Sequence, residues 1–259
     1  MKKAIIVASF GCSIKDSRER FIETIENTIM NTYKDIDCFR VFTSEIIRKK
    51  MKREENLDID NMKSCLEKLK EEKYTHVYVS VTHVIPGFEY EKVLNAVNEY
   101  KKDFEEIKIA RTFLDGQMGE DEVNVIRSYI NTGLKDDEAV VLAGHGTEHD
   151  SHKYYAQIEK LLRKDVKNLY IINIEGRPGI DNIMDELKEK KYKKVHLYPL
   201  LIVSGDHALN DIGSDDGNSI KTKITSGGID VSMHFTGLGE HTNAVNLFVY
   251  RLDEILTTP

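Results

Sequence analysis

Short runs of aliphatic and β-branched residues recur along the chain and alternate with longer stretches whose apolar positions follow a helical period. The runs are apolar almost throughout, which is typical of strands buried on both faces of a parallel sheet. The expected strands span 3–9, 37–42, 76–82, 107–113, 138–144, 168–174, 194–203 and 229–235. Amphipathic helices are expected over 16–32, 59–72, 89–103, 118–133, 151–164, 180–190 and 241–256.

Strand–helix alternation of this kind predicts an α/β fold with right-handed crossovers and helices on both faces of each sheet. Four strands followed by four more indicate two similar lobes, each a four-stranded parallel sheet, with the active site in the cleft between them. The expected domains are an N-terminal lobe over 1–134 and a C-terminal lobe over 135–259. The last helix, about 241–256, is a candidate to pack across onto the N-terminal lobe.

An internal repeat supports this division. A shift of 118 residues aligns 65–90 on 183–208 without gaps, with 7 of 26 positions identical. A second echo pairs FRVFTSE with YIINIE and sets Glu45 over Glu175. A third pairs the turn after the first strand, Gly11-Cys12-Ser13, with Gly144-His145-Gly146. Because the echoes keep the same order in both halves, we interpret them as the duplication of a half-domain.

Composition narrows the class of protein. The hydrophobic fraction of 40% and the charged fraction of 31% are ordinary for a globular protein, and no apolar run approaches the length of a membrane span. The basic start is followed by an apolar run that stops at Phe10, too short for a signal peptide, so we expect a cytoplasmic protein. Three widely spaced cysteines predict neither disulfides nor a zinc knuckle. A net charge of -7 argues against a nucleic-acid partner.

Three metal-capable side chains follow successive strands of the second half. In open parallel sheets the ligand lies beyond the carboxyl ends of the strands. His145, Glu175 and His207 stand at or shortly after three of these ends. Two imidazoles and one carboxylate suit divalent Co, Fe, Ni or Zn, with coordination positions left open. Each of the three has an ordinary structural interpretation on its own, and it is their coincidence that favours a metal site.

The glycines around His145 suit a site of this kind. Gly144 and Gly146 predict a sharp turn with little bulk on either side of the imidazole, which would leave room for a large flat ligand. The turn also resembles a phosphate-binding turn before a helix. It lacks the further glycines and the lysine of nucleotide-binding loops, so a nucleotide-binding protein is the weakest of the alternatives.

The first half offers a different set of side chains. Glu89 aligns with His207 under the 118-residue shift, and we expect it to face the cleft as a proton acceptor or an orienting group. His83 fits a cleft or a structural role equally, and Cys12 fits a small buried hydrophobe better than a ligand. The remaining histidines are interpreted as solvated or capping residues (His149, His152) and as packing residues within strands (His76, His196, His234).

At these residues the chain resembles the anaerobic cobalt chelatases of cobalamin synthesis, the CbiK-type sirohydrochlorin cobaltochelatases of the class II chelatase family. The resemblance runs nearly end to end. Its most specific stretches are VLAGHGTEHDSHKYY (141–155), INIEGRPG (173–180), LLIVSGDHALNDIGSDDGNSIK (200–221) and TGLGE (236–240). The chain departs from the family at Ile220, where relatives usually carry Trp, and this bears on how the nearby loop or the macrocycle packs.

The resemblance implies a lyase that inserts Co²⁺ into sirohydrochlorin, with His145, Glu175 and His207 as the metal set. His145 is also implied as the catalytic base, with Glu89 as the second catalytic residue. Fe²⁺, Ni²⁺ and Zn²⁺ remain possible metals, and no organic cofactor is expected. A homo-oligomer without nucleic-acid or membrane partners is implied as well. The tetrapyrrole is expected to contact Ser9, Phe10, Gly11, Ser13, Gly144 and Gly146.

Charge sets a difficulty for this interpretation, because sirohydrochlorin carries many carboxylates and the chain is acidic. Local groups must outweigh the overall field: Arg177, and the backbone amides of 11–13 and 144–147. Two alternatives stay open at this point. One is a ferrochelatase or nickel chelatase of the same fold, and the other is a two-lobed metal or tetrapyrrole carrier that does no insertion.

Overall fold

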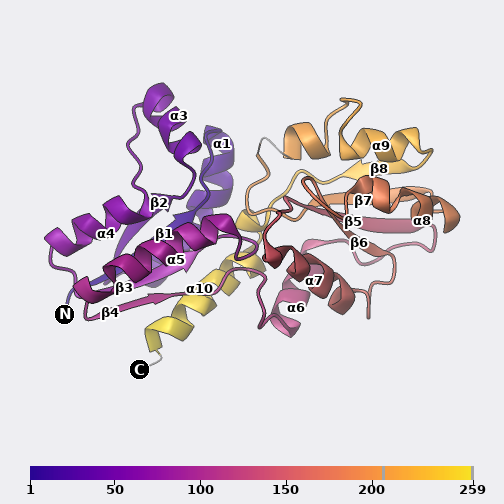
Figure 1. Ribbon diagram of the computed structural model, residues 1–259. Coiled ribbons are helices and arrows are strands. Elements are labelled where there is room, and N and C mark those ends of the chain that lie inside the picture. Colours follow the sequence, from indigo (N-terminus) through magenta and orange to yellow (C-terminus); the bar gives the residue numbers. More distant parts are fainter. Residues whose placement is uncertain (206–207, 258–259) are drawn as a thin grey trace. The chain divides into compact units, whose positions relative to one another are not determined.

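The computed structural model describes residues 1–205 and 208–257, which form two four-stranded parallel sheets flanked by helices (Figure 1). The strand order is β2-β1-β3-β4 in the first sheet and β6-β5-β7-β8 in the second. The strands are β1 (Lys3–Ser9), β2 (Asp37–Phe42), β3 (His76–Val81), β4 (Glu106–Ile109), β5 (Glu138–Gly144), β6 (Leu169–Asn173), β7 (Lys194–Pro199) and β8 (Asp230–Met233). The predicted fold class is confirmed.

Helices cover both faces of each sheet because the central strands are apolar on both sides. On one face of the first sheet, Ala4, Ile6 and Ala8 pack with apolar side chains of α4 and α5. The α-helices are α1 (Lys15–Ser17), α2 (Glu23–Thr32), α3 (Glu45–Glu55), α4 (Met62–Glu71), α5 (Phe88–Tyr100), α6 (Glu120–Tyr129), α7 (Lys153–Leu162), α8 (Met184–Glu189), α9 (Ile220–Ser226) and α10 (Thr242–Thr257). Within the described residues, none of these helices has the length and apolarity that a bilayer crossing requires.

Two helices, α3 and α9, lie outside the stretches expected to be helical. The α3 helix is mostly charged and buries only Met51, so it lacks the apolar stripe that marks other helices. Its start is fixed by the Ser44 side chain, which accepts a hydrogen bond from the backbone N–H of Ile47. The expected helix over 16–32 is divided by a π-helical turn at Arg18–Ile22.

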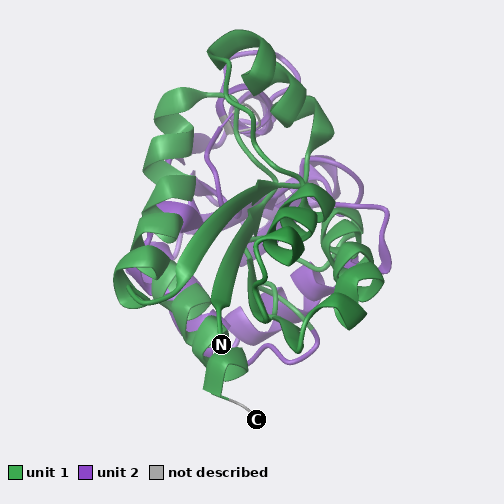
Figure 2. Cartoon of the chain, turned by 90° about the vertical axis from the view of Figure 1, so that its left-hand side faces the viewer, with its two compact units in different colours: residues 1–115, 244–259 green, residues 116–243 purple. Residues whose placement is uncertain are grey.

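The chain forms two compact units, coloured separately in Figure 2. Unit 1 comprises residues 1–115 and 244–259, and unit 2 comprises residues 116–243. The units differ from the expected lobes at α6, which belongs to unit 2, whereas α10 belongs to unit 1, the lobe onto which the last helix was a candidate to pack. Buried side-chain hydrogen bonds attach each of these two helices to its unit. On the last residue of α6, the Tyr129 hydroxyl donates to the carbonyl of Pro199. In α10, the fully buried Arg251 donates to the carbonyls of residues 112 and 113.

The two units repeat the same topology. Both sheets have the order 2-1-3-4 when strands are numbered within the unit, and β3 and β7 begin 118 residues apart, as the sequence repeat predicts. Two details of the sequence alignment are wrong, the pairing of Glu45 with Glu175 and the pairing of Cys12 with His145. Ser44 donates its backbone N–H to the carbonyl of Phe10, and Glu175 donates to the carbonyl of His145 in the same way. Ser44 is therefore the counterpart of Glu175, in place of Glu45, and Phe10 is the counterpart of His145.

Candidate metal centre

Two of the three expected ligands come together at the carboxyl edge of the second sheet. His145 follows β5 directly, and Glu175 lies two residues after β6, its neighbour in the sheet. The imidazole Nδ1 of His145 lies 3.9 Å from a carboxylate oxygen of Glu175. Their side chains are 42% and 64% exposed, so both are within reach of a ligand from solvent. The third expected ligand, His207, lies outside the described residues.

The His145 ring is oriented by its own loop. Its Nδ1 lies 3.2 Å from the carbonyl oxygen of Gly146, to which it donates when that nitrogen carries the hydrogen. In this tautomer Nε2 carries the lone pair, which is the form of imidazole that binds metals. The backbone N–H of Glu175 donates to the carbonyl of His145 at 2.8 Å, so the two loops are tied together beneath the side chains.

The glycines beside His145 allow close packing of the chain, whereas they were expected to leave room for a ligand. A Cβ on Gly146 would lie 1.8 Å from the carbonyl oxygen of Glu175, and one on Gly144 would lie 2.7 Å from the ring of Tyr155. The space beside the imidazole on these two sides is therefore filled by the chain itself. Gly146 also has φ +84, a conformation that favours glycine. These residues bring the His145 and Glu175 loops together rather than opening room for a ligand.

Asn173 closes the loop that carries Glu175 by hydrogen-bonding from the start of the loop to its end. Its backbone N–H donates to the carbonyl of Pro178 at 2.7 Å, and its side-chain amide donates to the carbonyl of Arg177 at 3.0 Å. Asn173 is the last residue of β6 and is buried. Sequence reasoning did not single out Asn173, although an amide at a strand end before a Gly-Arg-Pro-Gly turn is a signal for such a loop.

A complete metal-binding cluster is not formed by the described residues alone. Nowhere in 1–205 and 208–257 do three or more His, Cys, Asp or Glu side chains gather closely enough to hold an ion. His145 and Glu175 supply one imidazole and one carboxylate, and the sequence assigns the third position to His207. The three-ligand set stays a prediction.

In unit 1, Glu89 stands in the first turn of α5 beside His83. One oxygen of Glu89 lies 2.5 Å from the Lys92 ammonium, and the other is buried without a hydrogen-bond partner. The Nδ1 of His83 is likewise buried without a partner. Burial lowers the pKa of His83 to about 4, although the nearby Glu89 charge raises it. His83 is therefore neutral at neutral pH, and the pair combines a carboxylate with an uncharged imidazole.

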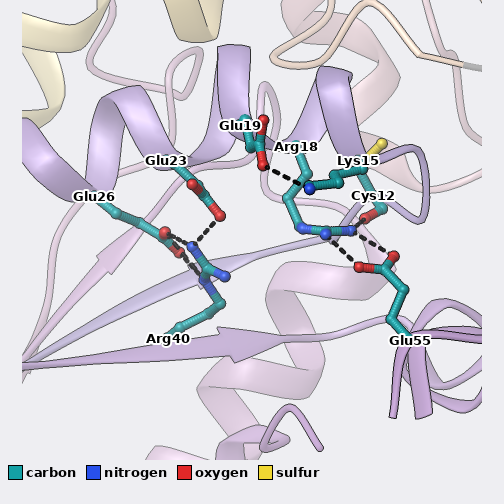
Figure 3. A network of polar contacts seen from close by, with 8 residues as sticks. All are labelled: Cys12, Lys15, Arg18, Glu19, Glu23, Glu26, Arg40 and Glu55. Carbon is teal, nitrogen blue, oxygen red and sulfur yellow. Dashed lines mark hydrogen bonds and ion pairs between the residues drawn. The ribbon is translucent and has the colours of Figure 1, made fainter. Parts of the chain in front are cut away.

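The loop after β1 is held by an ion pair between the buried Arg18 and the partly exposed Glu55, shown in Figure 3. Arg18, in the π-helical turn, donates to the carbonyl of Cys12 at 3.3 Å and pairs with the carboxylate of Glu55 at 2.6 Å. Gly11, with φ +98, packs closely against the ring of Phe42, where a Cβ would collide at 2.7 Å. Phe10 is thereby presented to solvent.

The residues expected to contact the tetrapyrrole differ in exposure. Phe10 is 47% exposed, and Gly11 and Ser13 are half-buried. Ser9, Gly144 and Gly146 are buried within the structure of their own unit. Contact of these six residues with a tetrapyrrole stays a prediction, and Phe10 is the one whose side chain is most available for it.

The other histidines have local roles. The Nδ1 of His149 accepts from the backbone N–H of Ser151, which confirms it as a capping residue. His196 in β7 lies 3.3 Å from Glu138 and 3.4 Å from His234, which directly follows β8. These two histidines belong to a polar cluster and are more than packing residues. The cluster is set against the ring of Tyr198, which stacks on His234 at 4.0 Å. Alternation along a strand cannot distinguish the two roles.

The fold is shared with solved sirohydrochlorin chelatases. SirB from Bacillus subtilis with Fe³⁺ superposes with a TM-score of 0.68 at 16% identity, covering 99% of this chain and 96% of that one. The sirohydrochlorin chelatase SirB from Bacillus subtilis subspecies spizizenii, in complex with cobalt, gives a TM-score of 0.63 at 16% identity, covering 98% and 95%. These likenesses define the class of fold: a chelatase-like pair of α/β units.

Sequence comparison identifies the family within that class. The family model for cobalt chelatase (CbiK) matches residues 3–257. The sirohydrochlorin cobaltochelatase of Salmonella typhimurium is 33% identical over 99% of this chain and 97% of its own length. Sirohydrochlorin cobaltochelatase CbiKC of Nitratidesulfovibrio vulgaris is 29% identical over 97% and 89%. The chain belongs to the cobalt chelatase (CbiK) family, and it is an enzyme of the chelatase class.

Proposed function

We propose that this enzyme inserts Co²⁺ into sirohydrochlorin in anaerobic cobalamin biosynthesis. The observation that carries the proposal is the His145–Glu175 pair, separated by 3.9 Å at neighbouring strand ends of a chain that the CbiK family model matches over residues 3–257. The curated relatives are named as sirohydrochlorin cobaltochelatases and match almost the whole chain. Residence in the cytoplasm and assembly into a homo-oligomer stay predictions.

The metal is a substrate, so its ligands must both hold it and release it. Imidazole and carboxylate ligands with open coordination positions suit Co²⁺ that is passed on to the macrocycle. We assign this role to His145, Glu175 and His207. Such a donor set also accepts Fe²⁺, Ni²⁺ and Zn²⁺, and it is the names of the curated relatives that favour cobalt among them.

Insertion releases two pyrrole protons, which the enzyme must accept. The nitrogen of His145 that holds the metal cannot hold a proton at the same time, so it is available only after the metal has left. Glu89 is a second acceptor, because one of its oxygens is buried without a hydrogen-bond partner while the other is paired with Lys92. We therefore assign the two protons to His145 and Glu89.

An anaerobic absorption spectrum of the protein with sirohydrochlorin and Co²⁺ tests the proposal. The expected result is the spectral change of metallation, with turnover abolished in His145→Ala. Glu89→Gln should bind Co²⁺ normally and lose about 100-fold in turnover, since a positioned proton acceptor contributes about that much. Glu91→Gln, on the same turn of α5, is the matched control. Spectra that stay unchanged with the unsubstituted protein would contradict the proposal, and full turnover in Glu89→Gln would remove Glu89 from the mechanism.

A further inference from the structure

The duplicated topology allows the strand ends of the two units to be compared position by position. Phe10 is the counterpart of His145, because each carbonyl accepts the backbone N–H of the segment after the neighbouring strand. Ser44 is the counterpart of Glu175 by the same bonds. Each loop then continues through a glycine with positive φ, Gly11 in unit 1 and Gly146 in unit 2. The positions that carry metal-capable groups in unit 2 therefore carry an aromatic ring and a small hydroxyl in unit 1.

Large apolar side chains are exposed at this edge of unit 1. Phe10 follows β1, Ile46 lies in the first turn of α3 after β2, and Phe88 opens α5 after β3. They are 47%, 79% and 55% exposed, respectively. Single exposed apolar residues are common on protein surfaces, but here one follows each of three adjacent strands. We call these three residues the unit 1 apolar edge.

The segments that carry the apolar edge lie close together. The backbone bond between Ser44 and Phe10 joins the loop after β1 to the start of α3. The side chain of Ile47 packs against Gly11. The pKa of Glu45 in α3 is lowered by its bond to Lys49 and also by the charges of Arg48 and Lys92. Because Lys92 belongs to α5, the first turns of the two helices are within electrostatic range of each other.

An arginine stands within one helical turn of this edge. The chain has ten arginines, and within the described residues only the guanidinium groups of Arg48 and Arg177 make no hydrogen bond, ion pair or ring contact. Arg48 lies one turn after Ser44, to whose carbonyl its backbone N–H donates. Its Nε is enclosed without a hydrogen-bond partner. The charge of Arg48 lowers the pKa values of Glu45 and Asp58, but its guanidinium forms no direct ion pair with either carboxylate. A guanidinium that is not bonded to a carboxylate is available for an anionic ligand.

We propose that Phe10, Ile46 and Phe88 bind the flat apolar face of the tetrapyrrole and that Arg48 binds one of its carboxylates. This assignment rests on the proposed function and names the part of the chain that holds the macrocycle. A planar ring with a polycarboxylate rim matches an apolar surface bordered by a cation, because the surface buries the ring face while the guanidinium pairs with the rim. In this arrangement the strand ends of unit 2 hold the metal and the strand ends of unit 1 hold the ring.

The test measures sirohydrochlorin binding and Co²⁺ binding separately on the intact protein. Phe10→Ser and Phe88→Ser should each raise the Kd for sirohydrochlorin, followed by quenching of its fluorescence, by about tenfold, because each removes a buried aromatic contact. Arg48→Met should raise the Kd for sirohydrochlorin by about fivefold and make this Kd less dependent on salt concentration. The Kd for Co²⁺ should not change in any of these variants. Phe10→Leu keeps the apolar contact and should bind sirohydrochlorin nearly as well as the unsubstituted protein.

Matched controls come from the same unit. Met30→Ser and Tyr250→Ser alter apolar residues that are 50% and 52% exposed on α2 and α10, and Arg53→Met removes an arginine of α3 that is paired with Glu54. All three should bind sirohydrochlorin normally. An unchanged Kd in a Phe10→Ser/Phe88→Ser double variant would overturn the assignment while leaving the proposed function standing. Loss of Co²⁺ binding in that variant would also overturn it, and an unsubstituted protein that binds no sirohydrochlorin would overturn both.

Discussion

At the scale of single residues, the proposed metal ligands differ from the residues that position them. His145 and Glu175 were predicted from one rule, that ligands lie beyond the carboxyl ends of parallel strands, and they lie together. The role of Gly146 could not be predicted in the same way. A glycine in a sequence shows only that a side chain is absent. The structure shows that the carbonyl of Glu175 occupies the space that a Cβ on Gly146 would need.

Replacing Gly146 by alanine tests this role. A Cβ there would lie 1.8 Å from the Glu175 carbonyl, in a backbone conformation with φ +84, so the two loops must separate. We expect Gly146→Ala to lower the free energy of unfolding by about 2–4 kcal/mol, measured by chemical denaturation, and to weaken Co²⁺ binding. Gly217→Ala is the control, because a Cβ at Gly217 meets nothing within 4 Å. Equal stability of the two variants would contradict this account.

His83 should make the protein sensitive to acid. Burial lowers its pKa from 6.5 to about 4, with Lys92 acting in the same direction and Glu89 against it. Below pH 6.5 the unfolded chain takes up a proton that the folded protein does not, so stability is lost as the pH falls toward 4. His83→Leu should lose less stability than the unsubstituted protein over this window, by up to about 3 kcal/mol at pH 4. The measurement is chemical denaturation at pH 7, 5.5 and 4.

The control for this prediction is His152→Asn, an exposed histidine at a helix start, which should leave the pH dependence unchanged. An identical loss of stability in His83→Leu and in the unsubstituted protein between pH 6.5 and 4 would show that His83 takes up a proton in the folded state. Its burial would then have no effect on acid stability.

At the scale of elements, strands were easier to predict than helices. Runs such as KAIIVAS are buried on both faces, and β1, β2 and β5 match their expected bounds. The expected strands over 107–113 and 194–203 extend beyond the observed β4 and β7. The α3 helix was missed because its eleven residues bury a single side chain and carry no apolar stripe. The break in the expected helix 16–32 was missed too, since a π-helical turn leaves the apolar periodicity of the sequence nearly unchanged.

The π-helical turn supports the loop after β1 through Arg18. Its guanidinium is almost fully buried and joins the Cys12 carbonyl to the Glu55 carboxylate, as Figure 3 shows. Arg18→Met leaves both partners without their donor, and we expect it to lower the free energy of unfolding by about 2 kcal/mol, because the Glu55 side chain is 28% exposed and regains some water. Thermal and chemical denaturation measure this. The control is Arg127→Met, which removes an exposed pair with Asp165, and an equal effect of the two substitutions would contradict the role of Arg18.

At the scale of the whole molecule, the sequence repeat predicted two related sheets, and both have the same strand order. The sequence named the last helix as a candidate for unit 1, but it did not predict that α6 belongs to unit 2. Such assignments depend on tertiary anchors, the Tyr129 hydroxyl for α6 and the Arg251 guanidinium for α10, which leave no mark on hydrophobic periodicity. The strand ends of the two units make the same backbone hydrogen bonds and differ in the side chains at the matching positions.

The central claim is that His145, Glu175 and His207 hold the cobalt before it enters the ring. Anomalous diffraction at the cobalt edge, from crystals of the protein soaked with Co²⁺, tests it most directly. The account predicts one principal cobalt peak about 2.0–2.2 Å from a nitrogen of each imidazole and from a carboxylate oxygen of Glu175. A principal peak bound elsewhere, or imidazoles of 145 and 207 too far apart to share the ion, would contradict it.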